Sequence, residues 1–423
     1  MTATDIHRAI QAVWRIESAK LIASLARMVR DVGVAEELAQ DALVVALERW
    51  PETGIPNNPG AWLTATAKRR AIDMFRHRRL AESKHREIGR QHDALQEAAV
   101  SELEEGLDDD IDDDLLRLIF VACHPVLSTE ARVALTLRLI GGLTTDEVAR
   151  AFLVAEATVA QRIVRAKRTL SEARVPFEVP RGADRVARLS SVLEVIYLIF
   201  NEGYSATAGD DWMRPQLCEE ALRLGRILAG LTPDEPEVHG LVALMEIQAS
   251  RLGARAGPSG EPILLNDQNR ARWDQLLIRR GLAALDRTGK LGGANGPYAL
   301  QAAIAACHAR ARTPEETDWP RIVSLYARLA ELMPSPVVEL NRAVAVRMAD
   351  GPAAGLALID QLGAEPALKG YHLLPSVRGD FLLRLRRFAE AAAEFERAAA
   401  LTNNAREREM LLGRAARCRS IQG

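Results

Sequence analysis

The chain has 423 residues, 48% hydrophobic and 26% charged, so it is long enough for two or three domains and too apolar for a wholly disordered protein. No stretch approaches the roughly 18–20 uninterrupted apolar residues of a membrane helix, and we expect no signal peptide at this N-terminus. Cys123, Cys218, Cys307 and Cys418 are far apart, which disfavours a zinc site or a disulfide framework and fits a reducing cytoplasm.

The composition favours helices over sheets. Aromatic residues make up only 4% of the chain, whereas long β-sheets are enriched in aromatic and β-branched residues. Alanine, leucine and arginine are abundant and are good helix formers. We therefore expect an all-α protein.

The formal net charge of −2 hides a strong segregation of charge along the chain. Residues 62–90 include nine basic and three acidic residues, and residues 91–114 include eleven acidic residues and no lysine or arginine. A second basic segment, 162–174, has five basic residues and one acidic residue. Two cationic segments separated by an acidic tether indicate a polyanion partner and a linker that shields the cations. Solvated helix faces are the alternative interpretation.

Apolar residues at helical spacing predict two helices near the N-terminus. The first spans 6–30, and the second spans about 35–50 and is stopped by Pro51. Glu36 and Glu37 open the second helix, where carboxylates suit the positive end of the helix dipole.

A loop rich in proline, glycine and asparagine, 51–60, leads to a third helix, which is predicted for 61–80. This helix is amphipathic and strongly basic at its end. The acidic stretch that follows, 88–110, is predicted to have no fixed structure of its own.

Residues 115–170 predict four helices, with Pro125 between the first two and Gly141-Gly142 at the end of the second. The third helix is short and opens with Thr144 and Glu147 at capping-box spacing. A short helix, a tight turn and a basic second helix together predict a helix-turn-helix.

The fourth helix, about 156–172, is the predicted recognition helix, because a DNA major groove is about as wide as a helix. Its predicted inward positions are Val159, Ile163, Ala166 and Leu170. Its predicted DNA-facing positions are Thr158, Gln161, Arg162 and Arg165, with Lys167 and Arg168 suited to phosphate contacts.

Three stretches, in family order, resemble regions 2.2, 2.3–2.4 and 4.2 of extracytoplasmic-function sigma factors, the dissociable initiation subunits of bacterial RNA polymerase. They are Val34 to Asp41 (VAEELAQD), Pro59 to Arg79 (PGAWLTATAKRRAIDMFRHRR) and Leu143 to Leu170 (LTTDEVARAFLVAEATVAQRIVRAKRTL). The resemblance implies a region 2 domain at 6–85, an acidic linker at 86–112 and a region 4 domain at 113–174.

The rest of the chain resembles the C-terminal extension of one sigma subgroup, a helical middle domain followed by tetratricopeptide-type repeats. The resembling stretches are 196–209 (IYLIFNEGYSATAG), 217–226 (LCEEALRLGR), 233–244 (PDEPEVHGLVAL) and 297–308 (PYALQAAIAACH). The resemblance implies a middle domain at 185–290, repeats at 296–420, and regulation through this extension, with a regulatory protein partner on the repeats.

Small residues at helix-pair spacing support the repeat prediction, because only small residues fit where two helices cross closely. In one copy, Gly379, Ala391, Phe395 and Ala398 have the small-small-aromatic-small spacing of that repeat. An earlier copy ends with Tyr326, Leu329 and Pro334, and the next copy opens with Ala343. A plain helical array without a ligand groove is the alternative.

The sequence departs from the family pattern at four positions. Leu153 stands where the turn of the helix-turn-helix usually has glycine, so we expect a turn without a residue free to take positive φ. Ala160 replaces a common lysine, Gln161 a small polar residue and Arg69 an asparagine. These changes bear on which promoter is recognised and leave the duplex-binding role in place.

The resemblance implies three groups of site residues. The residues expected to dock on a basic coiled coil of the largest polymerase subunit are Glu37, Leu38, Gln40, Asp41 and Val44. The cations expected to open the −10 element along a single strand are Lys68, Arg69, Arg70, Arg76, Arg78 and Arg79. The predicted recognition helix would read the −35 element. The loop 53–60 would supply polar backbone groups for a captured base, and Trp62 is predicted to be a core residue.

We expect no enzymatic activity and no metal or cofactor. Asn201, Glu202 and Tyr204 suggest a general base, but no nucleophile, metal-ligand set or phosphate loop accompanies them. We expect this motif to be a structural helix terminus or a regulatory contact with the sigma domains. His239 and His308 are single histidines in apolar helices and are predicted to be satisfied core groups.

The partners expected are core RNA polymerase and promoter DNA, with no membrane. Two alternatives stay open, a helix-turn-helix regulator with a sensor domain and a repeat scaffold that binds proteins. The first leaves residues 6–85 unexplained.

Overall fold

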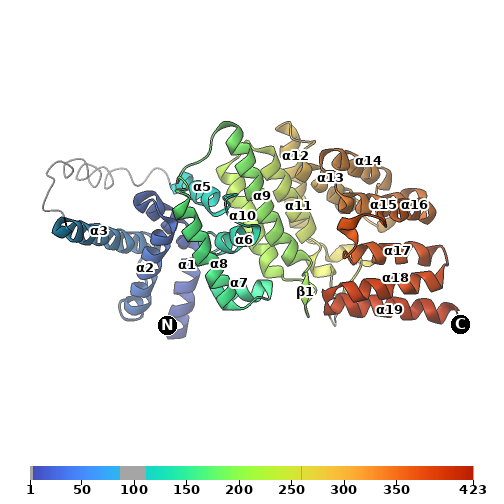
Figure 1. The fold of residues 1–423 in the computed structure, drawn as a ribbon, viewed down its shortest axis with the longest axis horizontal. Helices are drawn as coiled ribbons and strands as arrows, with labels where there is room; N and C mark the ends of the chain where they lie inside the picture. Colours follow the sequence, from blue (N-terminus) through green and yellow to red (C-terminus); the bar gives the residue numbers. More distant parts are fainter. Residues whose placement is uncertain (1–2, 86–110, 259, 423) are drawn as a thin grey trace. The chain divides into compact units, whose positions relative to one another are not determined.

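The computed structural model confirms the all-α prediction. It describes residues 3–85, 111–258 and 260–422, and in these residues the regular structure is helical apart from two strands of two residues each. The chain divides into two compact units, Met1–Ile196 and Tyr197–Gly423. Figure 1 traces the helices in chain order by colour.

The first unit contains two groups of helices on either side of residues 86–110. The predicted acidic linker therefore lies largely outside the described residues. The first group is α1 (Ala3–Val29), α2 (Val32–Thr53) and α3 (Pro59–His85). The second group is α5 (Ile111–Ala122), α6 (Thr129–Leu139), α7 (Thr145–Phe152), α8 (Glu156–Glu172) and the start of α9 (Gly182–Tyr204).

The predicted bounds of α2 are wrong at both ends. The helix begins three residues earlier, because the Asp31 side chain caps it by accepting a hydrogen bond from the Val34 N–H at 3.0 Å. It also continues past Pro51 to Thr53, since a proline in the last turn removes only one backbone donor. Glu36 consequently lies beyond the first turn and is 2% exposed, so it does not serve the helix N-terminus as predicted.

The four helices predicted between residues 115 and 170 are confirmed as α5 to α8. The first of them, α5, begins at Ile111, so the last residues of the acidic stretch, Asp112, Asp113 and Asp114, form its first turn. Carboxylates at a helix N-terminus interact favourably with the helix dipole. This end of the acidic tether is therefore helical.

The start of α9 is tied to α5 and α6. The Arg132 guanidinium donates to Ser191 Oγ at 2.5 Å and to Glu194 at 3.0 Å. Arg188 donates to the Phe120 carbonyl at 2.9 Å, and Ser191 donates to the Cys123 carbonyl at 2.7 Å. Residues up to Ile196 therefore belong with the helix-turn-helix group.

The second unit is built from consecutive helices. They are α10 (Pro215–Leu231), α11 (Pro236–Ala249), α12 (Gln275–Lys290), α13 (Pro297–Arg310), α14 (Trp319–Leu332), α15 (Pro336–Asp350), α16 (Pro352–Leu362), α17 (Leu373–Arg384), α18 (Phe388–Leu401) and α19 (Ala405–Gln422). From α13 onward, consecutive helices pack on one another, and α13 also packs on α11.

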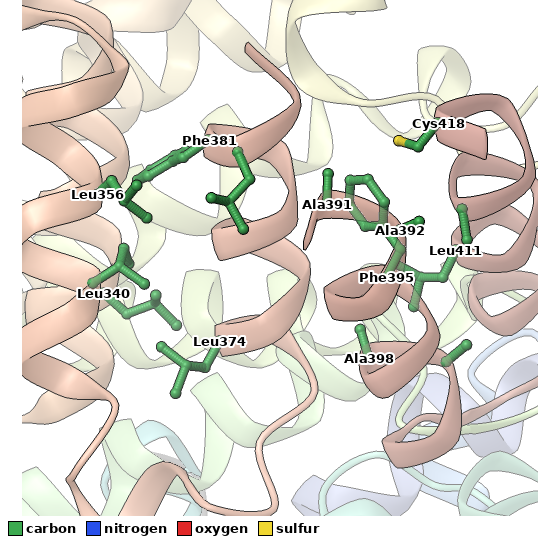
Figure 2. Packing of buried hydrophobic residues seen from close by; sticks show 14 of the residues in the cluster. Leu340, Leu356, Leu374, Phe381, Ala391, Ala392, Phe395, Ala398, Leu411 and Cys418 are labelled. Atoms are coloured by element: carbon green, nitrogen blue, oxygen red, sulfur yellow. The ribbon is translucent and has the colours of Figure 1, made fainter. Parts of the chain in front are cut away.

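Figure 2 shows the apolar core between α15 and α19, where the side chains of Phe381 and Phe395 are almost fully buried. A Cβ atom at Gly379 would lie 2.8 Å from the Phe395 ring, so glycine is required where α17 crosses α18. Ala391 and Ala398 are fully buried on α18. The small residues singled out in the sequence thus stand where helices cross closely.

The strands β1 (Ala208–Gly209) and β2 (Asn403–Asn404) pair in parallel. The buried Asn404 side chain donates to the carbonyls of Ala206 at 3.3 Å and Asp211 at 2.8 Å. Together these bonds join the loop after α9 to the loop before α19.

Candidate nucleic-acid and polymerase interface

The helix-turn-helix consists of α7 and α8. The predicted capping box at the start of α7 is confirmed, since Glu147 N–H donates to Thr144 Oγ1 at 3.1 Å and Thr144 N–H donates to Glu147 Oε2 at 2.8 Å. All four inward positions predicted for α8 are buried and pack it on its neighbours. The opposite face of α8 is left to solvent.

The expectation for the turn after α7 is wrong. Leu153 itself adopts the left-handed conformation, with φ 51° and ψ 42°, and caps α7 in the place that glycine usually takes. Its side chain is 54% exposed. The left-handed conformation brings the Cβ atom too close to the carbonyl oxygen, so this turn stores backbone strain.

The predicted DNA-facing residues of α8 fall into two groups. Thr158, Gln161 and Arg165 are exposed on its first three turns, and Arg162 beside them is half-buried. Arg168 is exposed and donates to Glu172 at 2.7 Å one turn later.

Lys167 lies at the end of α8 that faces α2. It forms an ion pair with Glu36, and only 20% of its side chain is exposed. One turn later, Ser171 donates to Asp31 Oδ2 at 3.1 Å, while the other oxygen of Asp31 caps α2. This end of α8 is therefore engaged with the N-terminal helix group.

Glu36 collects several donors at this contact. Arg138 on α6 donates to Glu36 Oε1 at 2.7 Å, and Gln40 donates to the same oxygen at 2.6 Å. Two cations from the helix-turn-helix group, Arg138 and Lys167, thus neutralise one buried carboxylate of α2. Sequence reasoning missed this role, although Glu36 stands next to Ala35 and three residues before Ala39, both of which are fully buried.

Two further ion pairs join the helix groups of the first unit. Arg27 on α1 lies 3.3 Å from the buried carboxylate of Asp114 on α5, which also accepts from Arg117 at 2.5 Å. Arg15 donates to Glu147 of the capping box at 2.6 Å. In this structure the two groups are in direct contact.

Two cations predicted for the −10 element, Arg69 and Arg76, are exposed on α3, and Lys68 is half-buried. Arg70 donates to Asp41 at 2.7 Å, with both side chains about half exposed. The side chains of Arg78 and Arg79 lie outside the described residues.

The loop before α3 is shorter than predicted, because Thr53 ends α2 and Pro59 begins α3. Asn58 accepts from the Ala61 N–H at 3.1 Å at the helix start. Trp62 is half-buried and packs edge-on against the buried Trp50, at 5.3 Å between ring centroids.

The predicted docking residues on α2 also divide. Glu37, Asp41 and Val44 are exposed at successive turns of one face. Leu38 is buried in the core at 6% exposure, and Gln40 donates its side-chain N–H to Glu36. The structure therefore brings three of the five residues to one surface.

The Asn201–Tyr204 motif forms the end of α9. Glu202 pairs with Arg214 and accepts from Thr207 Oγ1 at 2.9 Å, which makes it a structural helix terminus. His239 Nε2 lies 2.8 Å from the Pro233 carbonyl, so the ring has a partner, but the residue is half-buried and is not the core group that was predicted. His308 departs from the prediction, because it is buried but its Nδ1 has no hydrogen-bond partner in the described part of the chain.

Within the described ranges, no helix is both long and apolar enough to span a bilayer. The same residues contain no group of three histidine, cysteine, aspartate or glutamate side chains arranged to hold a metal ion.

Three family models match the chain. Residues 16–80 match sigma-70 region 2, residues 117–170 match sigma-70 region 4, and residues 188–289 match a family of unknown function, DUF6596. The first two matches cover most of the two helix groups of the first unit.

Two relatives extend these matches. An uncharacterized protein of Rhizobium meliloti (strain 1021) is 44% identical over 392 residues, which cover 91% of this chain and 90% of that protein. The probable ECF RNA polymerase sigma factor SigI of Mycobacterium tuberculosis is 29% identical over 180 residues, which cover 43% of this chain and 60% of SigI.

Proposed function

Because the chain belongs to the sigma-70 family, we propose that it is a sigma factor of the extracytoplasmic-function group that directs promoter-specific initiation by core RNA polymerase. The observation that carries this proposal is the order of its parts. A region 2 match that contains the basic helix α3 precedes a region 4 match that contains the helix-turn-helix.

The exposed face of α8 would read the −35 element in the major groove. Arginine pairs well with guanine and glutamine with adenine, so Arg165 and Gln161 are suited to direct readout. Thr158 would contact either a base or a phosphate.

The region 2 helices would have two partners. The exposed face of α2, with Glu37, Asp41 and Val44, would dock on a basic surface of the polymerase, and the α3 cations would follow the single strand of the −10 element. Arg70 links the two tasks through its ion pair with Asp41. Docking of Asp41 on the polymerase would release Arg70 for the DNA strand.

The contact between the two helix groups would have to open on a promoter. The −10 and −35 elements lie about 25 base pairs apart, which is about 85 Å at roughly 3.4 Å per base pair. Ion pairs such as Arg138–Glu36, at 2.7 Å, are incompatible with that separation. We therefore propose that the free protein holds regions 2 and 4 closed and that polymerase binding separates them.

Residues 197–423 would regulate this sigma factor. They form a helical unit of their own, and 188–289 match a family without a known role. A stack of helix pairs offers an extended surface for a protein partner. The helix-turn-helix regulator is the weaker alternative, since it gives α1 to α3 no role.

The test is reconstitution with core RNA polymerase. The full chain should co-purify with core enzyme and support run-off transcription from promoters that it occupies in cells. DNA binding without polymerase association would favour the regulator instead. A fragment for comparison should end after Ile196, because Arg188, Ser191 and Glu194 of α9 hold α5 and α6.

A further inference from the structure

Arg251, just after α11 in the second unit, is buried without an acidic partner in the described part of the chain. Only 8% of the residue is exposed. In the described part of the chain, its guanidinium forms no hydrogen bond or ion pair, and its Nε atom is fully enclosed. Burial of an unpaired cation is costly, so such residues are rare in protein interiors.

Two more arginines lie beside it. The guanidinium carbons of Arg251 and Arg270 lie 5.9 Å and 5.0 Å from the centre of the Trp273 ring. On the other side, the Tyr204 ring lies 5.7 Å from Arg251 and 3.7 Å from Arg255. Burial lowers the pKa of Arg255 and of Arg270, and repulsion from Arg251 lowers both further.

The ring faces account for only part of this arrangement. A cation–π contact stabilises a guanidinium through its plane, whereas the N–H groups at its edge still require acceptors. Arg270 donates to the carbonyls of His308 at 2.8 Å and Ala311 at 2.6 Å, yet its Nε is buried without a partner. The indole N–H of Trp273, a residue 4% exposed, is buried without a partner as well.

His308 completes the group. Burial lowers its pKa to about 3, with Arg251 and Arg270 acting in the same direction, so the imidazole is neutral at physiological pH. Two exposed carboxylates, Glu315 and Glu316, act in the opposite direction on the pKa of Arg270. Three buried N–H donors without acceptors, on Arg251, Arg270 and Trp273, therefore lie close to the Arg251 charge.

We propose that Arg251, Arg270, Trp273 and His308 bind a small oxyanion, a phosphate or a carboxylate group. An oxyanion supplies the acceptors that the Nε–H groups and the indole N–H lack, and its charge neutralises Arg251. The burial of Arg251, Trp273 and His308, with Arg270 half-buried beside them, limits the ligand to a small molecule. These residues belong to the second unit, whereas the proposed polymerase and DNA surfaces belong to the first, so the test does not depend on the function proposed above.

The test uses calorimetry on the full chain, with inorganic phosphate and succinate as separate probes at constant ionic strength. We expect one probe to bind at millimolar concentration or below, and which of them binds identifies the chemistry. Arg251→Met should weaken that binding about tenfold or more. The matched control is Arg272→Gln, an exposed arginine next to Trp273, which should retain binding.

A stability measurement separates binding from a structural role. If Arg251 serves a ligand, Arg251→Met should melt no lower than the wild type without anions, because it removes an uncompensated buried charge. Arg251→Lys keeps the charge and should bind more weakly while staying folded. Absence of binding by both probes, equal binding by Arg251→Met, or a lower melting temperature of that variant in anion-free buffer would each overturn the proposal.

Discussion

Both units of the molecule contain a carboxylate that collects several basic side chains, but the two carboxylates hold different kinds of contact. Glu36 pairs with Arg138 and Lys167, which belong to a helix group on the other side of residues 86–110. Asp380 on α17 pairs with Arg347, Arg384 and Arg414 inside a continuous stack of helices. Glu36 thus joins two helix groups that are separated in the sequence, whereas Asp380 links helices that already pack on one another.

The surroundings of the two carboxylates explain the difference. Arg347 and Arg414 also lie over the rings of Phe381 and Phe395, so the Asp380 network borders a large apolar core. Apolar burial holds those helices whether or not the charges are present. The contact between α2 and α8 around Glu36 is small, and the desolvation cost of its charges offsets much of their attraction. A contact of that kind is suited to opening.

The largest effect is expected from the repeat core. Phe395→Ala should lower the free energy of unfolding by about 3–5 kcal/mol, because it empties a buried site against Gly379. Chemical denaturation of the full chain measures this change. Leu412→Ala, at a position 48% exposed on α19, is the control and should change stability little. Equal losses of unfolding free energy in both variants would show that apolar burial around Phe395 does not hold these helices together.

Helix α8, the proposed reader of the −35 element, offers a second test, because its exposed face and its engaged end should behave differently. Arg165→Ala should weaken promoter binding by about 1–3 kcal/mol and relax selectivity for the −35 sequence. Arg168→Ala should weaken binding alike on all sequences, since Arg168 is suited to a phosphate. Fluorescence anisotropy with matched and scrambled duplexes measures both variants. Full −35 selectivity in Arg165→Ala would locate the recognition surface elsewhere.

The third test opens the contact between the helix groups. Glu36→Gln removes the charge that Arg138 and Lys167 share, so the free protein should bind promoter DNA about tenfold more tightly, or about 1.4 kcal/mol. Energy transfer between dyes on α3 and α8 should fall in the same variant. Glu48→Gln, an exposed change on α2, and Asp380→Asn in the repeats are the controls. Unchanged energy transfer would show that the ion pairs do not hold the contact.

Local signals made most of the fold predictable. Residues close together in the sequence predict the capping box at Thr144, the inward face of α8 and the small residues around Phe395. The structure has each of these features. The bounds of α2 were harder to predict from the sequence, because the cap at Asp31 and the tolerance of Pro51 each depend on the geometry of a single turn.

The role of Glu36 was out of reach for a physical reason. Its partner Arg138 lies 102 residues away in the sequence, and no local pattern reports such a contact. The same holds for Arg251, whose neighbours Tyr204, Trp273 and His308 come from three separate segments. Motif residues such as Leu38 also mix core and surface positions, which a family pattern alone does not separate.

The smallest effect concerns the backbone, which should behave alike in both units. Leu153 in the first unit and Arg386 in the second are exposed and take positive φ, at 51° and 60°. Glycine adopts this conformation without strain, although it loses more entropy on folding. Leu153→Gly and Arg386→Gly should each raise the free energy of unfolding by about 1 kcal/mol, as measured by chemical denaturation. Alanine at the same positions is the control and should bring no gain, because it keeps the Cβ atom. If only Arg386→Gly is stabilising, the Leu153 side chain must contribute packing that offsets its strain, and the turn of the helix-turn-helix would then be held by its side chain.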